Sequence, residues 1–293
     1  MGYSVKNILI IATGGTIAST DSGDGLVPAI DVKKLISYIP DIDGISIMNI
    51  DSSNMTPSLM KKVADAIVDN YGDFDGFVVT HGTDTLGYSA AAVTYMLKGL
   101  GKPVVFTGSQ LPIEHSDTDA KINLFDAVCF ACENVSGVYV VFNGIVIYGT
   151  HARKIKTTSF DAFESANIEA AAKVVNGVVV YSGEFSKEKH RYIEYNKYSE
   201  NDKSNNDSND TGLYADTDMC EDIMVLKLFP GIKTDIFDYI KEHYRGVIIE
   251  SFGIGGIPCT AGDEENDSNS SVAEKIGELT EAGIAVVITT QCM

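Results

Sequence analysis

Short apolar segments rich in β-branched residues alternate with longer amphipathic segments along most of the chain, and this alternation limits the possible folds most strongly. Several of the short segments are apolar at every position, which is typical of strands covered on both faces of a parallel sheet. The alternation therefore predicts an α/β fold with a mostly parallel sheet and right-handed crossovers. The predicted strands are residues 7–12, 76–80, 103–107, 137–142, 174–181, 223–228, 246–250 and 284–289.

Helical periodicity fills the intervals between these strands. Residues 57–71 place apolar side chains on one helical face, and Pro57 suits the first turn of that helix. Residues 119–134 and 271–283 show the same pattern, and the second of these helices is expected to end at Gly283.

A change of composition divides the chain into two parts. Residues 199–210 consist almost entirely of Ser, Asn and Asp, which cannot build a core. We expect a large N-terminal α/β domain over residues 1–185, a linker over 186–222 that contains this insert, and a smaller C-terminal α/β domain over 223–293. A second polar stretch, residues 263–271, lies between a strand and a helix of the smaller domain.

The charge of the chain excludes several classes of partner. It has 22 Lys and Arg residues against 41 Asp and Glu residues, a net charge of −19. Such a chain repels phosphate groups at long range, so we expect neither nucleic acid nor a membrane surface as a partner. No apolar run reaches the roughly 18–20 residues that a spanning helix needs.

The five cysteines are irregularly spaced, which predicts no disulfide framework and favours the reducing cytoplasm. Cys129 and Cys132 form a C-x-x-C pair inside a predicted helix, and no second pair follows at zinc spacing. We interpret both as core cysteines and expect no metal.

Three turns that follow predicted strands combine glycine with hydroxyl groups: TGGT at residues 13–16, THGTDT at 80–85 and TGSQ at 107–110. Glycine allows positive φ and close backbone approach, and hydroxyls supply donors, acceptors or nucleophiles. Because ligands of open parallel sheets bind beyond the carboxyl ends of the strands, these turns form the candidate site.

Each candidate also has a structural alternative. Neither a dinucleotide-binding nor a P-loop motif is present, so the TGGT turn fits a tight structural turn. Asp84 suits a substrate ammonium or a helix N-cap, and His81 suits a base or a hydrogen bond to the backbone. A threonine nucleophile needs an activating base. Lys154 is the candidate, because the apolar run 138–149 is expected to direct it to the same edge, unless its segment is a solvated basic loop.

Two of these segments together resemble the paired signatures of the L-asparaginase family: TGGTIA at residues 13–18 and THGTDT at 80–85. DSSNM at 51–55, TGSQ at 107–110 and the Arg153–Lys154 pair follow in the matching order. The DSSNM form and the lack of a signal peptide resemble the cytoplasmic, type I branch. The resemblance extends from residue 6 to the end of the sequence, apart from the two polar stretches.

The resemblance implies hydrolysis of L-asparagine to L-aspartate and ammonia through a threonine acyl-enzyme, with no metal or cofactor. By position, Thr16 matches the nucleophile. Thr83, Asp84 and Lys154 match the second threonine, the aspartate and the lysine of the family's catalytic triad.

The resemblance also implies the substrate contacts. Asp84 would bind the α-ammonium of asparagine, and Ser52 with the backbone of Ser53 would bind its α-carboxylate. Ser109 matches a residue that lines the pocket for the side-chain amide. The backbone N–H of Thr83 would help to hold the oxyanion.

Three features depart from the family's pattern. Leu26 stands where many members have a loop tyrosine, and the turn at 253–257 lacks the asparagine that many members supply to a neighbouring subunit. The family usually continues past the ITTQC segment, so we expect the C-terminal domain to lack a final helix and to expose Val286, Ile288 or their neighbours. The resemblance implies a homodimer or homotetramer, and we expect it to form through this domain.

Three alternatives remain open at this point. A glutaminase-asparaginase and the asparaginase-like subunit of a tRNA-dependent amidotransferase share the signatures, although the second normally has an extra N-terminal domain and the charge of −19 argues against tRNA. A catalytically impaired asparagine-binding sensor would keep Asp84 and Ser52 without turnover.

Overall fold

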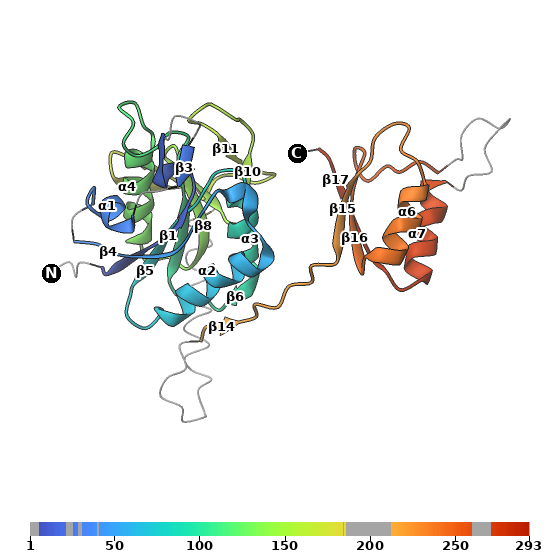
Figure 1. The fold of residues 1–293 in the computed structure, drawn as a ribbon, viewed down its shortest axis with the longest axis horizontal. Helices are drawn as coiled ribbons and strands as arrows, with labels where there is room; N and C mark the ends of the chain where they lie inside the picture. Colours follow the sequence, from blue (N-terminus) through green and yellow to red (C-terminus); the bar gives the residue numbers. More distant parts are fainter. Residues whose placement is uncertain are drawn as a thin grey trace, which may run out of the picture. The chain divides into compact units, whose positions relative to one another are not determined.

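The computed structural model describes residues 6–21, 26–28, 31–39, 41–183, 185, 212–259 and 271–292, and its chain divides into two compact units, residues 1–218 and 219–293 (Figure 1). The Ser/Asn/Asp-rich stretch at 199–210 lies outside the described residues, as do residues 22–25 before Leu26 and most of the second polar stretch.

The first unit is built on an eight-stranded sheet with the strand order β13-β12-β9-β8-β7-β5-β1-β4. The strands from β4 to β8 are parallel to their neighbours, and the strands from β8 to β13 are paired antiparallel. The mostly parallel sheet is therefore confirmed. Its strands are β1 (Ile8–Gly14), β4 (Asp43–Ile50), β5 (Gly76–Thr80), β7 (Pro103–Thr107), β8 (Gly137–Phe142), β9 (Ile145–Tyr148), β12 (Ala172–Val175) and β13 (Val178–Tyr181).

Helices cover both faces of this sheet, which explains the apolar strands. Ile8 and Ile10 of β1 belong to one core cluster, while Leu9 and Ile11 belong to another on the opposite face. The first cluster includes residues of α1 (Val32–Ile36) and α4 (Ala120–Ala131), and the second includes residues of α2 (Pro57–Asp69) and α3 (Leu86–Met96). Burying one such side chain contributes about 1.5–3 kcal/mol to the free energy of unfolding. β1 therefore stabilises the packing of both helical layers against the sheet.

Two Asn-Gly turns break runs that the sequence pattern treated as single strands. The predicted strand at 174–181 is a hairpin of β12 and β13, which turns at Asn176 and Gly177 with φ of 51° and 76°. Likewise β8 and β9 are joined at Asn143 and Gly144, with φ of 49° and 71°. Positive φ at both central residues is the signature of the tight hairpin turn that Asn-Gly favours. The prediction of continuous strands was wrong because periodicity does not register a reversal of direction.

The order of the strands places a ligand site. From β1 the chain passes to β4 on one side and then to β5 on the other side of β1. The direction of winding thus reverses between β1 and β5. Open sheets of this order bind ligands in the crevice at that reversal, beyond the carboxyl ends of the strands.

Shorter elements complete the first unit. In the part of this unit that the structure describes, two 3-10 helices follow β1 and β4, and three small two-stranded sheets lie apart from the main sheet. They are η1 (Thr16–Ala18) and η2 (Ser52–Asn54), with β2 (Ser19–Asp21) paired to β3 (Leu26–Pro28), β6 (Leu97–Lys98) to β14 (Tyr214–Ala215), and β10 (Ala152–Lys154) to β11 (Phe163–Ser165).

The second unit is a three-stranded parallel sheet with helices on one face (Figure 1). Phe237, Ile240 and Leu279 of the helices pack against Val247 and Ile249 of the central strand. Its elements are β15 (Ile223–Lys227), α6 (Asp235–His243), β16 (Gly246–Ser251), α7 (Val272–Glu281) and β17 (Ala285–Thr290).

Apolar side chains of the C-terminal strand are exposed. Val287 and Ile288 are 55% and 45% exposed, whereas Val286 packs partly against the core of the unit. Val225 of β15, which pairs with the central strand, is 59% exposed. The expected exposure at Ile288 or its neighbours is therefore present. Among the described residues of both units, no helix is long and apolar enough to cross a membrane.

Asp126→Asn on α4 tests the cost of a buried carboxyl group. Asp126 is 3% exposed, and burial raises its pKa to about 6. Because the folded pKa exceeds the unfolded one, the folded state binds this proton more tightly than the unfolded state does. The free energy of unfolding is therefore highest at low pH and falls as pH rises towards 6. We expect Asp126→Asn to raise Tm by a few degrees at pH 8 and to change it little at pH 4.

Asp65→Asn is the matched control, because Asp65 is a half-exposed helical carboxylate paired with Lys61. It should show no such gain at pH 8. Thermal unfolding followed by circular dichroism at both pH values decides the matter, and an equal gain for Asp126→Asn at pH 4 and pH 8 would contradict the buried-charge explanation.

Candidate active site at the carboxyl end of the sheet

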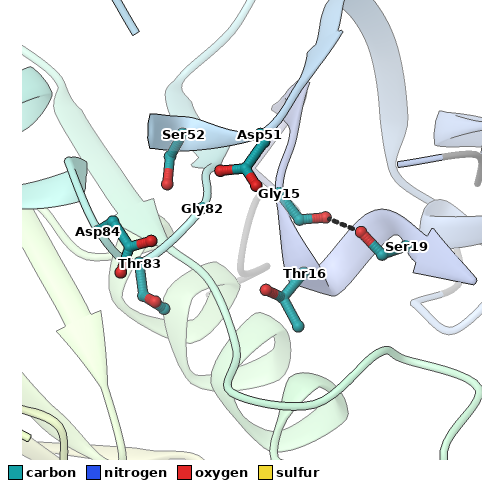
Figure 2. Close-up of a pocket in the computed structure, with 8 residues that line it drawn as sticks. All are labelled: Gly15, Thr16, Ser19, Asp51, Ser52, Gly82, Thr83 and Asp84. Atoms are coloured by element: carbon teal, nitrogen blue, oxygen red, sulfur yellow. Dashed lines mark hydrogen bonds between the residues drawn. The ribbon is translucent and has the colours of Figure 1, made fainter. Parts of the chain in front are cut away.

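A pocket lies beyond the ends of the adjacent strands β4, β1 and β5, at the reversal of winding (Figure 2). Figure 2 shows the turn after β1 and the turn after β5 on opposite sides of it, with the residues that follow β4 beside both. The residues that line it are Gly15, Thr16, Ser19, Asp51, Ser52, Gly82, Thr83 and Asp84.

Two glycines bring the turns together. A Cβ on Gly15 would lie 2.4 Å from the Cα of Gly82, and a Cβ on Gly82 would lie 2.5 Å from the hydroxyl oxygen of Ser52. Gly15 also has φ of 78°, a conformation that other residues rarely adopt. The TGGT turn is therefore both a tight structural turn and one wall of the pocket.

The hydroxyls of Thr13 in β1 and Thr107 in β7 hold strand ends together. Thr13 donates to the carbonyl of Thr80 at 2.9 Å, and Thr107 donates to the carbonyl of Val141 at 2.8 Å. The Thr16 hydroxyl is different, because it has no hydrogen-bond partner within the described part of the chain and its residue lines the pocket. Thr16 is thus the hydroxyl of the first turn that remains free to react.

Lys154 connects the two polar residues of the second turn. Its Nζ donates to the Thr83 Oγ1 at 2.7 Å and to the Asp84 Oδ1 at 2.7 Å. The Lys154 side chain is 20% exposed and that of Asp84 is 61% exposed. The basic-loop alternative for Lys154 therefore fails, because the amine is directed at the site.

Lys154 reaches the site by a route that the sequence pattern did not predict. β9 runs antiparallel to β8, so it leads away from the carboxyl edge. The chain then returns along α3: a Cβ on Gly149 would contact Thr94 late in that helix, and a Cβ on Gly87, early in the helix, would contact the carbonyl of Ala152. The lysine arrives through β10 beside α3 and not as the continuation of a strand.

The segment after β4 contributes Ser52 to the pocket. Ser52 is buried, and its carbonyl accepts a hydrogen bond from Thr85 at 2.8 Å, which ties this segment to the turn after β5. Ser53 is exposed and lies outside the pocket lining; its N–H and hydroxyl both donate to Asp51 at 2.9 Å.

Ser109 lies at the end of β7, next to β5, and it is buried outside the pocket lining. Its hydroxyl donates to the carbonyl of Leu111. The structure therefore gathers Thr16, Thr83 and Ser52 with Asp84 and Lys154, and leaves Ser109 and Ser53 engaged in hydrogen bonds of their own.

His81 is fully buried, and desolvation lowers its pKa to about 4. Its Nδ1 lies 2.8 Å from the carbonyl of Gly82, which can only accept, so Nδ1 carries the proton. His81 is a neutral residue that holds the turn, and it is not part of the pocket lining.

Sequence reasoning missed Ser19 as a lining residue. It gave no role of their own to Gly15, Asp51 and Gly82, although the motifs that it singled out contain them. Ser19 donates to the carbonyl of Gly15, four residues earlier, at 2.9 Å (Figure 2). No sequence motif marks this local hydrogen bond. Among the residues that the structure describes, no cluster of three or more His, Cys, Asp or Glu side chains is arranged to hold a metal ion.

The comparison with protein families accounts for both units. Residues 7–186 match the model described as asparaginase, N-terminal, and residues 222–293 match the glutaminase/asparaginase C-terminal domain.

Relatives of two kinds are found. One subunit of the glutamyl-tRNA(Gln) amidotransferase of Pyrococcus horikoshii is 34% identical over 307 residues, covering 99% of this chain and 63% of the relative. L-asparaginase 1 of Escherichia coli K12 is 29% identical over 300 residues, covering 98% of this chain and 80% of the relative. The chain thus spans less than two thirds of the length of the amidotransferase relative.

Solved structures share the fold. The thermostable L-asparaginase from Thermococcus kodakarensis matches with a TM-score of 0.80 at 27% identity, covering 97% of this chain and 80% of that one. L-asparaginase I from Vibrio cholerae matches with a TM-score of 0.79 at 26% identity, covering 99% and 82%.

Gly15→Ala tests whether the close approach of the two turns is required. The added methyl group would meet the backbone of Gly82 at 2.4 Å, and positive φ alone costs about 1–3 kcal/mol. We expect a fall in Tm of several degrees. Gly72→Ala, whose methyl group would meet nothing within 4 Å, is the control and should leave Tm nearly unchanged. Equal Tm values for Gly15→Ala and the unmodified chain would contradict the packing described here.

Proposed function

This chain belongs to the glutaminase/asparaginase family, and on that premise we propose that it hydrolyses L-asparagine to L-aspartate and ammonia. The observation that carries the proposal is the pair of 2.7 Å contacts from the Lys154 Nζ to Thr83 and Asp84. These two residues line the pocket together with Thr16, whose hydroxyl has no hydrogen-bond partner among the described residues.

In the proposed first step, the Thr16 Oγ attacks the carboxamide carbon of the substrate side chain. The C–N bond breaks, ammonia leaves with the proton of the hydroxyl, and an aspartyl ester of Thr16 remains. Lys154 and Thr83 move the proton, since a threonine hydroxyl is almost wholly protonated at neutral pH and needs an adjacent base. The Thr83 N–H would stabilise the oxyanion.

In the second step, water held by Thr83 attacks the ester carbon, and the C–O bond to Thr16 breaks. The oxygen of the water becomes part of the carboxylate of aspartate, and one of its protons restores the hydroxyl of Thr16. The two steps together use one asparagine and one water and need no cofactor. The 2.7 Å contact between Lys154 and Thr83 supports the proposal that these two residues together activate the water.

Substrate binding is proposed to use one carboxylate and one hydroxyl of the pocket lining. The largely exposed carboxylate of Asp84 would accept the α-ammonium, and the Ser52 hydroxyl, with the backbone of Ser53, would receive the α-carboxylate. We retain Ser109 as a proposed neighbour of the side-chain amide, which would require its bond to Leu111 to be exchanged on binding.

A second candidate is the amide-hydrolysing component of a tRNA-dependent amidotransferase, favoured by 34% identity to one subunit of such an enzyme. The charge of −19 disfavours direct contact of this chain with tRNA. Ammonia release by the purified chain separates the candidates: turnover of free asparagine without a partner supports the asparaginase, and release that requires an added partner supports the amidotransferase component. Equal rates with glutamine would indicate a glutaminase-asparaginase, and binding without release an impaired sensor.

We also propose a cytoplasmic homodimer or homotetramer. The exposed Val225 and Val287 on the sheet of the second unit support self-association, because such apolar patches are commonly covered by a partner. Free thiols at Cys132 and Cys220, both exposed, fit a reducing compartment, although Cys132 was expected in the core.

Thr16→Ala is expected to reduce kcat by several orders of magnitude and to leave Tm unchanged, because the hydroxyl has no partner to lose in the described structure. Thr20→Ala, which removes a hydroxyl from β2 outside the pocket lining, is the control and should keep its activity. Parallel ammonia-release and thermal-unfolding assays test this, and a fall in Tm that matches the loss of activity would make Thr16 structural.

Lys154→Met and Asp84→Asn are expected to separate chemistry from binding. Lys154→Met should lower kcat far more than it raises KM, because it removes the base, whereas Asp84→Asn should chiefly raise KM, because the ammonium loses its charged partner. Lys156→Met, which breaks the exposed ion pair with Asp161, is the control. Steady-state kinetics with asparagine decide, and a pure KM effect of Lys154→Met would move this residue to the substrate-binding set.

A further inference from the structure

Gln110, the last residue of the TGSQ turn, clamps a distant loop. Its Nε2 donates to the carbonyls of Thr157 at 3.1 Å and Ser159 at 3.0 Å. Both partners can only accept, so the amide nitrogen must face them. Both hydrogens of this side-chain amide are therefore used to join the end of β7 to one loop.

That loop is the tip of the hairpin that carries Lys154. β10 pairs antiparallel with β11, with Lys154 opposite Phe163. The N–H of Ile155 then donates to the carbonyl of Ala162 at 2.8 Å, and the tip lies between these two residues. Gln110 thus binds the hairpin directly beyond the residue that bears the catalytic amine.

The hairpin needs such support, because it forms a two-stranded sheet separate from the main sheet. At its base the carbonyl of Ala152 lies against Gly87, and Phe163 is buried against Phe142. Among the described side chains, Gln110 is the one that donates hydrogen bonds from outside the hairpin to its tip.

The fixed end of the clamp is rigid. The carboxylate of Asp119, which is 5% exposed, accepts the N–H of Gln110 at 3.1 and 3.0 Å and the N–H of Leu111 at 3.1 Å. Asn123 donates to the same carboxylate and to the carbonyl of Gly108. A buried, fully bonded network at the start of α4 therefore holds the turn from which Gln110 reaches out.

We propose that Gln110 is a positioning residue that fixes the tip of the Lys154 hairpin and so keeps the Lys154 Nζ at hydrogen-bond distance from Thr83. This inference rests on the proposed role of Lys154 as the base. Lysine has a long, flexible stem, so its reach depends on where the backbone is held, and small displacements of a catalytic group cost large factors in rate.

Three substitutions separate the donor function from size. Gln110→Met keeps the shape and removes both donors, and Gln110→Glu turns carboxylate oxygens towards two carbonyls. Gln110→Lys keeps a group that can donate two hydrogen bonds. A lysine does this elsewhere in the molecule, where the Lys102 Nζ donates to the carbonyls of Tyr71 and Phe74. Asp161→Asn, which breaks the exposed ion pair with Lys156 at the same tip, is the control.

Steady-state kinetics on the full chain should show kcat lower by on the order of tenfold in Gln110→Met, and lower still in Gln110→Glu, with KM within about twofold. Gln110→Lys should recover most of kcat, and Asp161→Asn should keep it. An effect of the substitutions on KM alone, or unchanged kcat in both Gln110→Met and Gln110→Glu, would overturn the proposal. A kcat of Gln110→Lys no higher than that of Gln110→Met would overturn it as well.

Hydrogen exchange read by mass spectrometry tests the clamp independently of catalysis. The N–H of Ile155 donates to the carbonyl of Ala162 and the N–H of Ala166 to that of His151. Both amides should exchange faster in Gln110→Met and Gln110→Glu, and at an unchanged rate in Asp161→Asn. Unchanged exchange in all variants would refute the clamp. Faster exchange in a chain that releases no ammonia from any amide would instead mark the proposed function as the part that failed.

Discussion

The close approach of Gly15 and Gly82 is the contact on which the rest of the site depends. A methyl group on Gly15 would lie 2.4 Å from the Cα of Gly82, so only bare backbone allows the turns after β1 and β5 to meet. The strand order places these two turns at the reversal of winding, where parallel sheets bind ligands. The two threonines that follow the glycines, Thr16 and Thr83, consequently face one pocket from opposite sides (Figure 2).

The site combines groups of two origins. Thr16, Thr83 and Ser52 sit directly after strands, so the sheet itself positions them. Lys154 is brought in from a separate hairpin that runs back along α3, and its amine meets the hydroxyl of Thr83 at 2.7 Å. Lys154, the proposed base, therefore relies most on tertiary contacts for its placement, among them the two hydrogen bonds from Gln110 to the tip of its hairpin.

Most of the fold was predictable because apolar periodicity reports burial. The completely buried strands β1, β5 and β7 and the amphipathic α2 appear in the sequence as such. β4 was missed because its residues are only partly buried and alternate weakly. The hairpin turns at Asn143-Gly144 and Asn176-Gly177 were missed because periodicity is blind to direction, although Asn-Gly is itself a strong turn signal. The route of Lys154 depends on one of these turns and could not be predicted without it.

The proposed function requires that the amide substrate acylates Thr16 in the pocket at the reversal of winding. Rapid chemical quenching during turnover of asparagine, followed by peptide mass spectrometry, measures this directly. We expect an aspartyl adduct on the peptide that contains Thr16, formed together with a burst of ammonia. Steady ammonia release without an adduct, or an adduct on Thr83 instead, would contradict it.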